Sequence, residues 1–173
     1  MSEVYILIGG NLSDRERALT FAISEISKNI GKITLTSSIF ESEPWGFSSP
    51  DLFLNQVVKV QTILTPKATL KKLQEIERLY GRARHSGNYE SRTIDLDILF
   101  FDDLMIHERD LHIPHPRLHM RKFTLSPLVE IAGDYVHPFI RKSMNDLAAE
   151  CTDRSQVRLF KKDMAKSNVH NEL

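Results

Sequence analysis

Two aspartates occupy alternate positions in the apolar segment Ile94-Asp95-Leu96-Asp97-Ile98. The isoleucine and leucine residues predict a strand, on which successive side chains point to opposite faces. Asp95 and Asp97 would then project together, about 7 Å apart, with their apolar neighbours on the other face. Carboxylate oxygens in this arrangement suit a pair of Mg²⁺ ions that take their remaining ligands from water and substrate phosphates. The segment therefore indicates magnesium-dependent chemistry on a phosphate.

This acidic pair has a second interpretation, because an isolated Asp-x-Asp is typical of the solvated face of an edge strand. The residues behind the pair argue against that interpretation. Leu99-Phe100-Phe101 follows at once, and a face that only contacts water would not continue into an apolar block. Together with Arg92 just ahead of the pair, this block lowers the weight of the solvated-face interpretation, and the residues alone leave both interpretations open.

Basic residues gather next to the acidic pair. The stretch from Lys71 to Arg92 contains six basic and three acidic residues, a local excess of +3, although the whole chain has a formal net charge of +0. Arginine offers a planar set of donors that matches phosphate oxygens, and it keeps its charge. Arg82, Arg84 and Arg92 are therefore candidate phosphate ligands. The alternative is that basic residues here complement the negative end of the preceding helix.

A third group of residues could hold a flat polar ring. Phe53 and Asn55 share one face of a predicted strand, and Trp45 stands in the loop before it. An aromatic side chain offers a stacking surface, and a carboxamide offers a donor beside an acceptor. Asn55 lies in an apolar strand and needs a partner there, which is either a ligand or a cross-strand hydrogen bond. The spacing alone leaves both open.

The elements that must position these groups follow from the apolar periodicity. They are, in chain order, a strand over 4–8, a helix over 14–30, strands over 33–40 and 53–62, a helix over 66–80 and a strand over 93–101. Gly9-Gly10 would stop the first strand, and Ser13 and Glu16 would form a capping box. This order predicts an α+β fold with a ferredoxin-like βαββαβ core, an antiparallel sheet with helices packed on it and a C-terminal extension.

The C-terminal part has a less regular pattern. Its predicted elements are an extended or turned segment over 112–117, a helix over 123–132, a capped helix start at Ser143 and a strand over 157–160. His112, His115 and His119 do not form a zinc motif, because Pro114 and Pro116 keep them off a common helical face. His115 alone is a candidate phosphate donor next to the aspartate strand.

Length and composition limit the class of protein. With 173 residues, 41% hydrophobic and 27% charged, the chain suits one domain over 1–162 followed by a polar tail over 163–173. Its balanced charge indicates no nucleic-acid partner and no membrane partner. The single Cys151 excludes an intrachain disulfide framework and fits a reducing compartment. The apolar run from Val4 to Ile8 is too short for a signal peptide or a membrane span, so we expect a cytoplasmic protein. We also expect a monomer.

These segments together resemble one known family. Arg92-Thr93-Ile94-Asp95-Leu96-Asp97-Ile98-Leu99 is similar to the signature of the 6-hydroxymethyl-7,8-dihydropterin pyrophosphokinases, enzymes of folate biosynthesis. Further similar blocks occur in the same order: Ile8-Gly9-Gly10-Asn11-Leu12, Glu43-Pro44-Trp45-Gly46, Phe53-Leu54-Asn55, Tyr80-Gly81-Arg82-Ala83-Arg84, Pro114-His115-Pro116-Arg117 and Arg121-Lys122-Phe123. The resemblance covers about residues 4–140 and implies the ferredoxin-like fold.

The resemblance also implies a reaction and its residues. The β,γ-pyrophosphoryl group of the co-substrate ATP would pass to the hydroxymethyl oxygen of the reduced pterin, with release of AMP and with two Mg²⁺ ions held by Asp95 and Asp97. The implied catalytic residues are Arg82, Arg92, Asp95 and Asp97. The implied ATP-binding residues are Gln74, Glu77, Arg84, Ile98, His115 and Arg121. The implied pterin-binding residues are Glu43, Pro44, Trp45, Phe53, Asn55 and Phe123.

One loop departs from the family pattern, and two other functions stay open. Many relatives have Trp-Gly-Pro where this chain has Tyr89-Glu90-Ser91, which adds an anion near the phosphates. A magnesium-dependent nucleotidyltransferase also uses a strand-borne aspartate pair, but it releases pyrophosphate in place of AMP. A ferredoxin-like RNA-binding module is disfavoured, because Asp95 and Asp97 would repel RNA phosphates.

Overall fold

The computed structural model describes residues 1–12, 14–81 and 94–161. Its elements follow in the order β1 (Ser2–Gly10), α1 (Arg15–Asn29), β2 (Gly31–Thr36), β3 (Ile39–Ser42), β4 (Phe53–Thr62), α2 (Pro66–Leu79), β5 (Asp95–Phe101), β6 (Ile106–Glu108), β7 (Leu111–Ile113), α3 (Lys122–Ala132), α4 (Met144–Glu150) and β8 (Val157–Lys161). A short 3₁₀ turn, η1 (Leu118–Met120), precedes α3.

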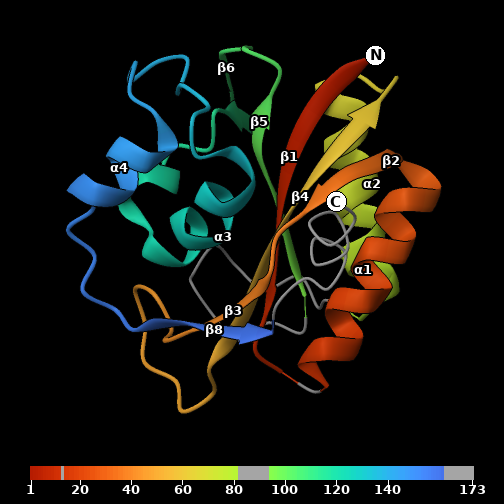
Figure 1. Cartoon of the computed structure of the whole chain (residues 1–173). Helices are drawn as coiled ribbons and strands as arrows, with labels where there is room; N and C mark the ends of the chain where they lie inside the picture. The colour runs from red at the N-terminus through yellow and green to blue at the C-terminus, as the bar shows by residue number, and fades with distance from the viewer. Residues whose placement is uncertain (13, 82–93, 162–173) are drawn as a thin grey trace, which may run out of the picture.

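The main sheet is antiparallel and separates two layers of helices. Its strand order is β5-β1-β4-β3-β8, and β2 also pairs with β4. Helices α1 and α2 cover one face, whereas α3 and α4 lie on the other side of the sheet (Figure 1). Strands β6 and β7 form a separate hairpin. The βαββαβ order and the antiparallel sheet confirm the predicted ferredoxin-like α+β fold.

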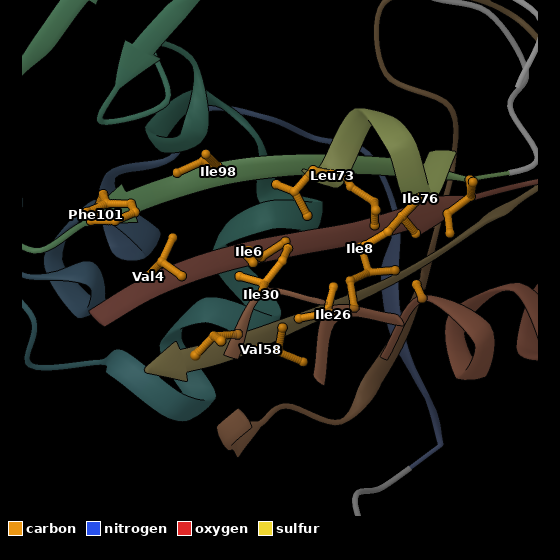
Figure 2. Close-up of a cluster of buried hydrophobic side chains, with 14 of the residues drawn as sticks. Val4, Ile6, Ile8, Ile26, Ile30, Val58, Leu73, Ile76, Ile98 and Phe101 are labelled. Carbon is orange, nitrogen blue, oxygen red and sulfur yellow. The ribbon is translucent and has the colours of Figure 1, made fainter. Parts of the chain in front are cut away.

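Two hydrophobic clusters lie on the two faces of this sheet. The first packs Ile6 and Ile8 of β1 against Ile26 of α1 and Leu73 of α2 (Figure 2). The second packs the intervening residues of β1, such as Leu7, against α3 and α4. Strand β1 is therefore buried on both faces, which explains why its sequence is a continuous apolar run without polar alternation.

Strand β1 is longer than the sequence predicts. The expected stop at Gly9-Gly10 is wrong, since the strand continues through both glycines. Gly9 pairs with Asn55 of β4 on one side and with Asp95 of β5 on the other. Pairing with two neighbouring strands holds the backbone extended there, although glycine alone favours a turn.

The single strand predicted over 33–40 is also wrong, because β2 and β3 pair with β4 as two separate strands. The break lies at two buried serines. Ser37 Oγ accepts a hydrogen bond from Val57 N at 2.9 Å, and Ser38 N and Oγ donate to Glu130 Oε1 at 3.1 and 2.9 Å. Hydrogen bonds of the serine side chains thus follow the backbone hydrogen bonds of β2 at the point where that strand ends. An alternating sequence pattern does not reveal this change of hydrogen-bond partners.

Helix α1 begins one residue later than the predicted capping box. Its N-cap is Asp14, whose carboxylate accepts from Arg17 N at 3.1 Å. The pairing of Ser13 with Glu16 is therefore not the start of the helix, and Ser13 itself lies outside the described residues. The capped helix start predicted at Ser143 is confirmed in α4, and Thr65 caps α2.

A β-bulge in β5 determines where the polar face of that strand ends. Ile98 pairs with Ile6 and Phe100 pairs with Tyr5, so Leu99 is the extra residue between them. Leu99 and Phe100 consequently both belong to the second cluster. The face that carries the two aspartates therefore runs into hydrophobic core at one end.

The chain returns to the sheet after α4. Strand β8 pairs with β3, so that Leu159 lies opposite Phe40 and Val157 lies opposite Ser42. Residues up to Lys161 thus belong to the same sheet as β1. Among the described residues, no helix combines the length and the apolar character that crossing a membrane requires.

Candidate active site

Strand β5 carries the acidic pair on the sheet face opposite α1 and α2. Its burial alternates, with Asp95 and Asp97 partly exposed and Leu96 and Ile98 buried. The buried residues belong to the first cluster, which packs against α1 and α2. The two carboxylates therefore share the other face, at an edge of the sheet, because β5 is the first strand in the sheet order.

Asp95 lies in a row of residues that crosses three strands, since Gly9 pairs both with Asp95 and with Asn55. Asn55 is 2% exposed, and its Nδ2 donates to Ser42 Oγ at 2.8 Å. This is the cross-strand hydrogen bond that the sequence left open. A Cβ placed on Gly9 would lie 3.4 Å from Asn55 Oδ1, so the amide oxygen faces the middle of the row. Ser42 was not predicted, because only the pairing of β3 with β4 reveals it.

Two hydrogen bonds tie β5 to elements outside the sheet. Glu77 of α2 is 4% exposed, and its Oε1 accepts from Leu96 N at 2.9 Å. His115 N donates to Leu99 O at 2.9 Å. These bonds fix the aspartate strand against α2 and against the segment that follows β7. Glu77 thus has a structural partner, and the ATP contact expected of it stays a prediction.

A buried arginine joins several of the predicted ligand-binding residues. Arg121, at the start of α3, is 7% exposed. Its Cζ lies 4.8 Å from the Trp45 ring centroid and 5.6 Å from that of Phe123. Its Nη1 lies 3.5 Å from Nε2 of His115. The aromatic residues expected around the pterin and the histidine expected at the phosphates therefore meet at one guanidinium, which attracts both ring faces and anions.

His115 is neutral at physiological pH. Burial lowers its pKa to about 4, the charge of Arg121 acts in the same direction, and Asp95 opposes both. Its Nδ1 accepts from Arg117 N at 3.1 Å, so the proton of the neutral ring resides on Nε2. His115 Nε2 and Arg121 Nη1 are then two donors 3.5 Å apart, an arrangement that suits a shared acceptor such as a phosphate oxygen.

The loop between β3 and β4 is anchored where it enters β4. Arg15 Nη1 donates to Leu52 O at 2.8 Å and to Glu41 Oε2 at 2.8 Å. Asn11 Nδ2 donates to Asp51 O at 3.3 Å. The end of β1 and the first turn of α1 therefore position this loop relative to the aspartate row.

The same loop carries other residues of the predicted pterin site. The rings of Phe53 and Phe47 meet edge to face, with centroids 5.9 Å apart. Glu43 Oε2 accepts from Gln156 N at 2.9 Å, which ties it to the chain entering β8. Pro44 is partly exposed. Phe47 thus joins the aromatic group, although no pattern in the loop sequence indicates it.

Several predicted residues are not brought to this row. Gln74 is exposed on α2, and the Ile98 side chain is 6% exposed within the first cluster. Arg82, Arg84 and Arg92 lie outside the described residues, so their phosphate contacts stay predictions.

The donor set fits magnesium better than zinc. In the described ranges, no three or more histidine, cysteine, aspartate or glutamate side chains are grouped to hold a metal ion. Asp95 and Asp97 offer hard oxygens and partial exposure. A cation held by them would complete its coordination with water and phosphate oxygens, which is the usual situation of Mg²⁺.

Two histidines with lowered pKa values predict acid-sensitive stability. His137 Nδ1 accepts from Phe139 N at 3.2 Å and from Ile140 N at 3.1 Å, and burial lowers its pKa to about 4. His115 also has a pKa of about 4. Both lie below the ordinary value of about 6.5, so the unfolded chain binds more protons between about pH 6.5 and pH 4. The free energy of unfolding should fall as the pH drops through this window, by up to ~1.4 kcal/mol per pH unit for each histidine.

Urea unfolding at successive pH values down to about pH 5 measures this slope. His137→Asn keeps an acceptor oxygen near the Nδ1 position but does not titrate, so this variant should lose about half of the slope. A free energy of unfolding that is constant across the window, or an unchanged slope in the variant, would contradict the lowered pKa of His137.

Comparisons with known proteins identify the family that this chain resembles. Residues 5–133 match the family model described as 7,8-dihydro-6-hydroxymethylpterin-pyrophosphokinase. The 2-amino-4-hydroxy-6-hydroxymethyldihydropteridine pyrophosphokinase of Aquifex aeolicus is 36% identical over 152 residues, which are 88% of this chain and 94% of that protein. The protein of the same name from Bacillus subtilis is 35% identical over 170 residues, 97% of this chain and 96% of the relative.

Some similar proteins are much longer. The folic acid synthesis protein fol1 of Pneumocystis carinii is 43% identical over 135 residues, and this chain spans 18% of it. A solved Plasmodium falciparum HPPK-DHPS with SDX-DHP has a TM-score of 0.69 and 19% identity, and the match covers 87% of this chain and 43% of the solved one. An HPPK-DHPS solved in complex with substrates has a TM-score of 0.71 and 16% identity, covering 86% and 43%. At these identities the solved structures support the fold alone.

Proposed function

The chain belongs to the 7,8-dihydro-6-hydroxymethylpterin-pyrophosphokinase family, and we propose that its reaction takes place on the sheet face between Asp95 and Asn55. The enzyme transfers pyrophosphate from ATP to the hydroxymethyl group of 6-hydroxymethyl-7,8-dihydropterin in folate biosynthesis, and AMP is released. The observation that supports this placement is the row of Asp95, Gly9 and Asn55, in which a carboxylate and a side-chain amide flank a glycine.

The phosphates of ATP lie at the Asp95 end of the row. Asp95 and Asp97 would hold two Mg²⁺ ions, which would neutralise the charge of the phosphate oxygens. His115 and Arg121 donate to a phosphate oxygen from the side, and His115 keeps this role throughout the neutral pH range because its pKa is about 4. Three further arginines are proposed to complete the anion site: Arg82, Arg84 and Arg92.

The reduced pterin lies at the Asn55 end of the row. Asn55 Oδ1 accepts from the polar edge of the ring, and the bond from Asn55 Nδ2 to Ser42 holds the amide in that orientation. Phe53 and Phe123 enclose the ring, and Trp45 stands beside it. Trp45 and Phe123 both lie next to the Arg121 guanidinium, which supports placing them together. The hydroxymethyl group then extends along the row toward the phosphates of ATP.

The transfer is a displacement at the β-phosphorus of ATP. The hydroxymethyl oxygen forms a bond to this phosphorus and gives its proton to solvent, while the bond to the oxygen shared with the α-phosphate breaks, so AMP leaves with that oxygen. The protein forms no covalent bond to the substrates. Its contribution is alignment of the two reactants and neutralisation of phosphate charge.

The remaining assignments concern the periphery of the site and the organisation of the chain. The nucleoside of ATP is assigned to Gln74, Glu77 and Ile98, and the loop before β4 adds Glu43 and Pro44 to the pterin site. We assign residues 1–162 to one domain, which is monomeric and cytoplasmic. The pairing of β8 with β3 supports the single domain. The acidic sheet face disfavours a nucleic-acid partner.

Product analysis tests this function. Incubation with ATP, Mg²⁺ and the reduced pterin is expected to form AMP and the pterin pyrophosphate in equal amounts. Omitting the pterin or chelating the metal should abolish both products. A nucleotidyltransferase would release pyrophosphate and attach AMP to the acceptor, so free pyrophosphate without free AMP would replace the proposal by that alternative.

A further inference from the structure

Gly9 interrupts a column of large side chains on β1. On the sheet face shared with Asn55 and Asp95, this strand presents Tyr5 and Leu7, which belong to the second cluster, and then Gly9. Because side chains alternate between the faces of a strand, a residue other than glycine at position 9 would place a third side chain on this face. Glycine has no side chain, so the second cluster ends at Gly9, next to the polar residues Asn55 and Asp95.

The fold itself does not require a glycine at this position. A Cβ on Gly9 would lie 3.4 Å from Asn55 Oδ1 and 3.7 Å from Leu54 O, both ordinary contact distances. By contrast, a Cβ on Gly31 would lie 2.0 Å from Gln61 O, so packing explains that glycine. Glycine inside a strand is unfavourable, and it often marks a place where another molecule approaches the backbone closely.

The position of Gly9 indicates what approaches it. Gly9 separates Asn55 from Asp95 by two strand spacings of about 4.8 Å each, or about 10 Å in total. In the proposed function, the ring edge is held at Asn55 and the metal-bound phosphate at Asp95. The carbon that bears the hydroxymethyl group must therefore pass over Gly9.

We propose that Gly9 is a specificity-determining position, whose missing side chain lets the flat reduced pterin lie against the sheet with its hydroxymethyl group within reach of the phosphates. This inference rests on the proposed function. A methyl group at this position would lift the ring from the backbone and from Asn55 Oδ1. It would leave the nucleotide in place, because the described phosphate ligands Asp95 and Asp97 lie on the neighbouring strand β5, and His115 and Arg121 follow that strand in the chain.

Substitution at Gly9 separates this role from a structural one. In the presence of a non-hydrolysable ATP analogue, Gly9→Ala should weaken binding of 6-hydroxymethyl-7,8-dihydropterin roughly 10-fold, and Gly9→Val roughly 100-fold. Affinity for the ATP analogue alone should change less than about 2-fold. The thermal unfolding midpoint of Gly9→Ala should equal or exceed that of the unmodified chain, since the strand gains a side chain without a clash.

Gly31→Ala is the matched control, because the same change there meets backbone at 2.0 Å. It should lower the unfolding midpoint and leave pterin affinity unchanged. Unchanged pterin affinity in Gly9→Ala, equal losses for pterin and ATP analogue, or a midpoint lowered as in Gly31→Ala would each overturn the inference. None of these results affects AMP formation by the unmodified chain, which tests the proposed function separately.

Discussion

Replacing Asp97 by alanine should reduce turnover by roughly 10³-fold or more, because a metal site that has lost one of two carboxylates no longer neutralises the phosphate charge during transfer. Asp97 is partly exposed on β5 and contributes no buried apolar surface. Its neighbours Leu96 and Ile98 keep the strand in the first cluster. The unfolding midpoint should therefore stay near that of the unmodified chain.

Steady-state rates as a function of Mg²⁺ concentration, together with thermal unfolding, measure both effects. Asp97→Asn keeps the shape but removes the charge, so its loss should approach that of the alanine variant. Asp134→Asn is the matched control, because it removes one charge far from the row while its side-chain oxygen still accepts from Asn145 Nδ2. Near-normal turnover in Asp97→Ala at saturating Mg²⁺ would exclude a metal-binding role for this residue.

Replacing Arg121 by alanine should lower kcat/KM by roughly 10²–10³-fold, the second-largest effect that we expect. One guanidinium lies near the rings of Trp45 and Phe123 and next to Nε2 of His115. Its removal takes away a proposed phosphate donor and at the same time an aromatic contact of the loop before β4. The KM for ATP and the affinity for the pterin should therefore both deteriorate, unlike in Gly9→Ala.

Arg121→Lys separates the two contributions, because lysine keeps the charge but lacks the planar group that stacks on rings. This variant should recover part of the ATP affinity and little of the pterin affinity. Arg17→Ala removes an exposed arginine of α1 and should leave both unchanged. If Arg121→Ala changed ATP affinity alone, the contacts with Trp45 and Phe123 would have no part in pterin binding.

The local pattern of the chain was sufficient for much of the fold. Alternation around Asp95 and Asp97 assigned the carboxylates to one strand face and their apolar neighbours to the other, because neighbouring residues on a strand always point to opposite faces. The cap residue Ser143 similarly located the start of α4. The resemblance of the signature segments supplied the family and its reaction, which residue spacing alone left at magnesium-dependent chemistry on a phosphate.

Long-range pairing decided the rest. Three features of the site depend on residues from different segments of the chain. They are the pairing of Gly9 with Asn55 and Asp95, the hydrogen bond from Asn55 to Ser42, and the contact of Arg121 with Trp45. Such contacts depend on which strands become neighbours and in which register, and that is set by the burial of the whole sheet between two layers of helices. A periodic pattern therefore tells which face a side chain takes, whereas only the assembled sheet tells which side chains it meets there.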